Sequence, residues 1–179
     1  MKKLGFFLLS SLVYSSLAPI SAHAQGAAPE MFGVSEVIIE YARFDDPKTA
    51  NGCGLSREEI ASALVESFAG TTVPTVAAVE ARPPVMGIAR IQLIPEISTY
   101  MNENFDCISW VSLSAESHAN TVIPPINTLR SITAIYWRQH AKVASGQSNH
   151  SQQVKALLKK LADQFAQQYR LDQPPVIPK

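Results

Sequence analysis

The sequence is poor in cysteine and in charged residues, and neither sign of charge prevails. Only two of its 179 residues are cysteine, too few for a zinc ribbon or a dense disulfide scaffold. Lys and Arg number 15 and Asp and Glu also number 15, so no surplus of cations indicates a nucleic-acid binder. With 46% hydrophobic residues, the chain is too apolar to be disordered, and its length suits a single domain.

Motifs that would carry chemistry are also missing. No two histidines have the spacing that places both imidazoles on one metal ion, and no Gly-x-Ser-x-Gly nucleophile elbow is present. Gly52-Cys53-Gly54 lacks the third glycine of a phosphate loop, and Glu58 and Glu59 would repel a phosphate there. The sequence therefore predicts no catalytic residue, no metal ligand and no cofactor.

The first 24 residues have the pattern of a cleaved secretory signal peptide. Lys2 and Lys3 precede a mostly apolar stretch over 4–17, and Ala22-His23-Ala24 fits the small-x-small cleavage rule. The alternative is an uncleaved membrane anchor, but the apolar stretch falls short of the ~20 residues that span a bilayer. Cleavage before Gln25 would leave 155 residues with 13 basic and 15 acidic side chains and no transmembrane segment. We expect the mature chain in the periplasm, with release from the cell as the alternative.

Export also predicts the state of the two cysteines. Cys53 and Cys107 are the only thiols of a chain bound for an oxidising compartment, which favours a disulfide between them. The rival interpretation is a catalytic thiol at Cys53, because a helix N-terminus lowers the pKa of a thiol.

Hydrophobic periodicity predicts four strands and two helices in the order β-α-β-β-β-α. The strands are expected over 34–44, 86–99, 107–116 and 128–143, and the helices from Ser56 to Gly70 and over 151–170. This order indicates an α+β fold, a two-layer sandwich with a mostly antiparallel four-stranded sheet and two helices on one face. The domain covers 33–170, between a flexible leader over 25–32 and a proline-rich tail over 171–179.

Local signals add detail to these elements. Ser56 and Glu59 form a capping-box pattern at the start of the first helix. Pro95 indicates a sheet edge or a bulge, residues 117–127 are expected to form a loop, and the inward parity of the fourth strand is ambiguous. A right-handed crossover between the first two strands would bring Cys53 and Cys107 to the same edge of the domain.

Strand alternation also predicts a mixture of apolar and charged residues on the sheet face that the helices leave uncovered. Five apolar residues fall on this candidate interaction face: Ile38, Ile88, Ile94, Ile108 and Trp110. Glu36 and Arg90 fall on it too and are expected to pair across two strands. Apolar residues within a polar surface are typical of a binding site. In the alternative, loops or tails cover these residues, or they are scattered singly.

We expect an exported, non-enzymatic accessory or interaction module that binds an envelope protein or a second copy of itself. Two alternatives stay open: a small periplasmic hydrolase that uses loop residues around His118 or His140, and a secreted factor that acts on another cell. A concave polar pocket would favour the hydrolase, and a flat apolar surface would favour the interaction module.

Overall fold

The computed structural model describes residues 31–78, 89–123 and 128–173, with the side chains of 119–123 and 128–131 left undescribed. The predicted signal peptide, leader residues 25–30, Ile88 and tail residues 174–179 lie outside the described residues.

The described residues form an α+β structure with six strands and three helices. The strands are β1 (Glu36–Ile39), β2 (Arg43–Phe44), β3 (Thr75–Ala77), β4 (Arg90–Met101), β5 (Asp106–Ile123) and β6 (Thr128–Gly146). The helices are α1 (Pro47–Gly52), α2 (Arg57–Ser67) and α3 (Gln147–Asp172). All strands belong to one sheet of order β3-β1-β4-β5-β6, and β2 pairs with β4.

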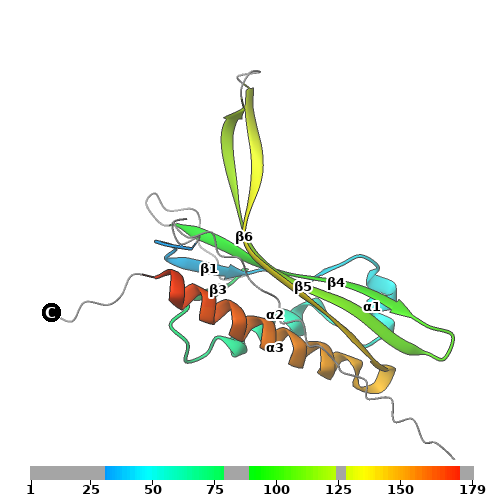
Figure 1. Cartoon of the computed structure of the whole chain (residues 1–179). Coiled ribbons are helices and arrows are strands. Elements are labelled where there is room, and N and C mark those ends of the chain that lie inside the picture. Colours follow the sequence, from blue (N-terminus) through cyan, green and yellow to red (C-terminus); the bar gives the residue numbers. More distant parts are fainter. Residues whose placement is uncertain (1–30, 79–88, 124–127, 174–179) are drawn as a thin grey trace, which may run out of the picture.

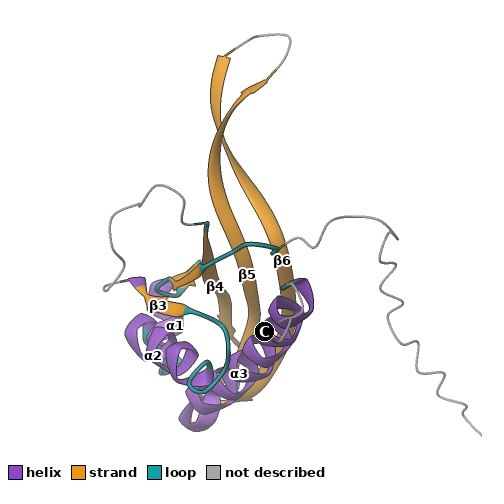
Figure 2. Ribbon diagram, turned by 90° about the vertical axis from the view of Figure 1, so that its left-hand side faces the viewer, coloured by secondary structure: helices purple, strands orange, loops and turns teal. Residues whose placement is uncertain are grey.

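Two layers build the body, as the sequence predicted. Helix α3 packs along β5 and β6, and α2 packs beside it on β1 and β3 (Figures 1 and 2). The apolar stripe of α3 supplies Val154, Leu158, Leu161 and Phe165 to the core. From the sheet come the inward residues Val37, Ile91, Leu93, Val111 and Leu113. We call the face without helices the open face.

The sheet is mixed, so the expectation of a mostly antiparallel four-stranded sheet was wrong. β1 runs parallel to both β3 and β4, and β2 is parallel to β4, whereas β4, β5 and β6 are antiparallel. The single first strand expected over 34–44 is split into β1 and β2. The Glu40 amide donates to the Leu93 carbonyl, and the next bond of this ladder would require an N–H at Pro95. Proline has none, so the ladder breaks opposite it and resumes at β2.

A long hairpin replaces the loop expected over 117–127. β5 pairs with β4 only up to Glu116, while its pairing with β6 continues to Ile123 and Thr128. The end of this hairpin projects beyond the body as a two-stranded arm (Figure 1). The β-branched run Thr121-Val122-Ile123 suits a strand, and its pairing partner is close in sequence.

A β-bulge determines which residues of β6 face the core. The register shifts between Ala115 and Glu116, which pair with Trp137 and Ile135 and leave Tyr136 unpaired. Since an extra residue reverses the alternation, Tyr136 and Trp137 both pack against the core and Ile135 is exposed.

Helix α1 was not predicted, and its signals are local. Asp46 caps it by accepting hydrogen bonds from the Lys48 and Thr49 amides, and Pro47 occupies the first turn. In α2, the Ser56 hydroxyl accepts from the Glu59 amide as expected. The Glu59 carboxylate, however, forms an ion pair with Lys155 of α3 at 2.6 Å.

Both ends of the domain include residues that were predicted to lie in the flexible leader or in the flexible tail. Met31, placed in the leader, is fully buried, and its amide donates to the Asp172 carboxylate at 3.3 Å. Tyr169 donates from its hydroxyl to the Val34 carbonyl at 2.7 Å. The last turns of α3 therefore hold the start of the described chain.

The predicted disulfide is confirmed. Cys53 and Cys107 are bonded, with their Cα atoms 6.0 Å apart and a sequence separation of 54. Cys53 follows α1 and Cys107 lies just after the β4–β5 turn, so the bond ties the α1–α2 junction to the end of the central hairpin. Both cysteines are fully buried, which removes the thiol of Cys53 as a candidate nucleophile.

Replacing both cysteines by serine should lower the free energy of unfolding by about 4 kcal/mol, because the bond restricts the unfolded chain. Urea denaturation of the two mature proteins measures the difference. Intact-mass analysis before and after reduction should show the loss of two hydrogens in the native protein, and two thiols that are freely alkylated without reduction would contradict the bond.

Candidate functional site

Three of the five residues predicted for the candidate interaction face, Ile38, Ile108 and Trp110, lie on the open face, whereas Ile88 lies outside the described residues. Trp110 is 51% exposed in β5, and Ile38 and Ile108 are half-buried on the same face. Strand alternation places them there because their neighbours Val37, Ile39 and Val111 point into the core.

Ile94 does not belong to an accessible surface. Its side chain is fully buried in β4, although alternation places it on the open face. It pairs with Ser114, whose hydroxyl donates to the Glu116 carboxylate at 2.7 Å, and Glu116 in turn accepts from Arg138 at 3.0 Å. This part of the open face is therefore occupied by packed side chains, and Ile94 cannot contact a partner.

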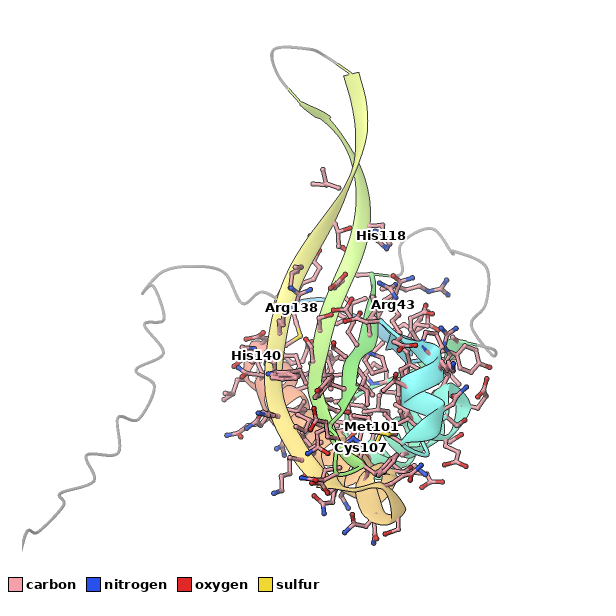
Figure 3. All side chains as sticks on the ribbon, turned by 90° about the vertical axis from the view of Figure 1, so that its right-hand side faces the viewer. Arg43, Met101, Cys107, His118, Arg138 and His140 are labelled. Carbon is pink, nitrogen blue, oxygen red and sulfur yellow. A yellow bond between two sulfur atoms is a disulfide. The ribbon has the colours of Figure 1, made fainter. Side chains whose placement is uncertain are left out.

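A hollow of about 520 Å³ opens on this face beside Trp110. Residues from β2, β4, β5 and β6 line it, and Figure 3 shows Arg43 and His140 on either side of the strands between them. The lining residues are Arg43, Asp45, Glu96, Ile97, Ser98, Trp110, Val111, Ser112 and His140. Its size falls within the range of small-molecule sites, roughly 300–1,000 Å³.

Charges around the hollow are largely paired. Arg43 lies 3.8 Å from Glu96, directly across from it in the β2–β4 register. The Lys142 ammonium lies 4.9 Å from the centre of the Trp110 ring, a distance suited to a cation–π contact. The site therefore offers an aromatic surface beside both hydrogen-bond donors and hydrogen-bond acceptors.

Strand alternation beyond Thr99, where the second strand was predicted to end, finds one further exposed residue. Tyr100 is 57% exposed and pairs with Ile108 on the open face. Phe105, exposed in the β4–β5 turn, adopts a φ of 61° that few residues other than glycine adopt. The polar residues of the hollow left no sequence signal, because only the pairing of four strands brings them together.

The predicted ion pair of the open face is present. Arg90 contacts Glu36 across β4 and β1, in the same register row, and both side chains are largely buried. An ion pair in this position fixes the register of the parallel strands.

The three histidines of the described residues lie in different settings. His140 lines the hollow opposite Ser112, and His118 on the exposed arm shares a 3.1 Å hydrogen bond with Thr133. His150, at the start of α3, contacts Ser109 through Nε2 at 2.8 Å and Ser145 through Nδ1 at 2.9 Å.

The Ser109–His150 pair resembles a nucleophile and its general base only in the short distance between the two side chains. Both residues are fully buried, and Ser109 is also hydrogen-bonded to Thr99 at 2.9 Å. A substrate could not reach this hydroxyl, so we interpret the network as one that ties α3 to β4, β5 and β6.

The described ranges, 31–78, 89–123 and 128–173, show neither a metal-ligand cluster nor a membrane-spanning helix. These residues contain no group of three His, Cys, Asp or Glu side chains placed to hold a metal ion. None of the described helices is long and apolar enough to cross a membrane.

Burial of His150 predicts a pH-dependent stability. Removal from water lowers the pKa of this imidazole below its ordinary value near 6.5, since burial disfavours the charged form. The unfolded chain then binds more protons than the folded one, so the free energy of unfolding should fall as the pH drops below about 6.5. Urea denaturation between pH 7.5 and 5 should show a steeper fall for the native sequence than for His150→Gln, with His118→Gln as the exposed control. Equal slopes for all three proteins would contradict this assignment.

Comparisons with known proteins find similarity among solved structures alone. No family model matches the chain, and no curated protein matches it. Among solved structures, the chain is similar to a protein from Helicobacter pylori described as a neuraminyllactose-binding hemagglutinin homolog. The two are 11% identical over 81% of this chain and 88% of that one, with a TM-score of 0.26. A superposition this loose carries no argument about fold or function.

Proposed function

We propose that the mature chain is an exported, non-enzymatic binding module that contacts an envelope protein through its open face. The observation that carries this proposal is the exposed indole of Trp110 at the wall of the hollow. A large aromatic side chain left half in water on a sheet face is the kind of anchor that dominates protein interfaces.

The surroundings of Trp110 support binding by a surface. Tyr100 and Ile108 extend the apolar area toward the β4–β5 turn, while Arg43, Glu96 and Lys142 provide a polar rim. An apolar centre within a polar rim is the usual anatomy of an interface. The disulfide anchors this end of the sheet, so the surface is held in place before binding.

A hydrolase is the second candidate, because His140, Ser112 and Asp45 line the same hollow. Among the described residues, no hydrogen bond joins His140 to a serine or a carboxylate. A general base must be oriented toward its nucleophile. Binding is therefore the better supported function.

Export implies that the protein isolated from the cell envelope begins at Gln25. N-terminal sequencing or intact-mass analysis of the periplasmic fraction should find the 155-residue chain. Recovery of the whole chain from the membrane fraction would contradict cleavage and indicate an anchor.

Trp110→Ser should weaken partner binding by more than about tenfold, because truncating an interface anchor typically costs 2 kcal/mol or more. Tagged mature protein is used to capture proteins from an envelope extract. The dissociation constant is then measured for the captured partner after purification. Leu171→Ser is the matched control, since Leu171 is exposed on α3, away from the open face.

Two results would overturn the proposal. One is a partner that binds the native sequence, Trp110→Ser and Leu171→Ser with equal affinity. The other is ester hydrolysis by the native protein that His140→Gln abolishes, which would establish the hydrolase instead.

A further inference from the structure

The sheet has two edges, and each is bordered by a helix and a hollow. β6 ends the sheet on one side, next to α3, and β3 ends it on the other side, next to α2. Within the described ranges, β6 pairs only with β5 and β3 only with β1. Unpaired strand edges offer backbone N–H and C=O groups to another chain.

The β6 edge is basic. A hollow of about 290 Å³ lies between β6 and α3, with Val143, Ala156 and Leu157 in its apolar part and Lys142 and Lys160 at its rim. Lys159 is exposed on the next position of α3. No acidic side chain lines this hollow.

The β3 edge has the opposite charge. A hollow of about 340 Å³ lies between α2 and strands β1 and β3, with Glu58 and Glu66 among its lining residues. Its apolar part is formed by Ile39, Ala61, Val65, Ala77 and Ala78. Tyr41, 43% exposed, also lines it, and no basic side chain does.

This contrast reflects how charge is distributed along the whole chain. Residues 128–172, which form β6 and α3, carry seven Lys or Arg and two Asp or Glu. Residues 31–127 carry five Lys or Arg and twelve Asp or Glu. Among the described residues, the hollow at the β6 edge is lined by lysines and the hollow at the β3 edge by glutamates.

We propose that copies of this chain associate side by side, with the β6–α3 edge of one copy on the β3–α2 edge of the next. Because both helices lie on the same face, this arrangement continues the sheet and the helical layer together. It places Lys142 and Lys160 opposite Glu58 and Glu66. The same pairing already holds α2 to α3 within one copy, where Lys155 contacts Glu59.

Charge repulsion also disfavours a symmetric dimer in which two identical edges face each other. Two β6 edges facing each other would bring lysine against lysine, which costs free energy, whereas unlike edges attract. A contact between two different surfaces leaves one basic and one acidic edge free at the ends. It therefore builds rings or open chains rather than a closed dimer.

A charge swap tests the contact in the mature, disulfide-bonded protein. Sedimentation velocity should show a mean mass that grows with concentration and falls as salt is added, because screening weakens exposed pairs. Lys160→Glu cancels the positive charge of the β6–α3 hollow, which keeps Lys142, and Glu66→Lys cancels the negative charge of the β3–α2 hollow, which keeps Glu58, so each variant alone should associate at least about tenfold more weakly. An equimolar mixture of the two should recover association, since the unchanged basic edge of Glu66→Lys can meet the unchanged acidic edge of Lys160→Glu. Lys48→Glu with Glu103→Lys, both exposed outside the two hollows, is the matched control.

Three outcomes would overturn the proposal: a native protein that stays monomeric in low salt, variants that associate as strongly as the native protein, or a mixture that does not exceed its separate components. Thermal unfolding of each variant verifies that the fold is intact. Lys160 and Glu66 do not line the hollow of the open face, so this experiment and the test of Trp110 can fail independently.

Discussion

The packing of α3 on the sheet is the contact on which the rest of the structure depends. Phe165 is fully buried where the helix meets the other elements, with ring centres 5.4 Å from Trp137 and 6.0 Å from Phe68. One side chain thus joins β6, α2 and α3. The same helix positions His150 against Ser109 at its start and holds Met31 and Val34 at its end. Because all the helical mass lies on one side, the other face of the sheet is left open.

This one-sidedness produces the surfaces available for binding. The open face presents Trp110, Tyr100 and a hollow, while each edge strand, β3 and β6, pairs with a single strand within the described residues. The disulfide closes the end of the domain nearest the β4–β5 turn, and the β5–β6 arm projects from the opposite end (Figure 1). Binding surfaces on different sides of a small domain allow a module to contact a partner and its own copies at once.

The candidate site was predictable where alternation is regular and the strand ends are clear. Trp110, Ile38 and Ile108 follow from the period of two, as does the pair of Glu36 and Arg90. Ile94 follows the same period but is buried, because the group around Glu116 and Arg138 occupies that part of the face. The hollow itself was not predictable, since Arg43, Glu96, Ser112 and His140 come from four strands whose alignment is set by their pairing.

The sequence by itself determined the α+β class, the stripe of α3, the Ser56 cap and the pairing of the two cysteines. These depend on local periodicity, on side-chain capping and on there being only one possible partner for each thiol. Tertiary structure alone decided that the predicted first strand splits into β1 and β2 opposite Pro95 of β4. It also decided the bulge at Tyr136, the length of the arm and the burial of Ile94. Each of these depends on which strand lies alongside and how far its hydrogen bonds extend. A strand's neighbours are chosen by contacts between residues far apart in the chain, and no local pattern records them.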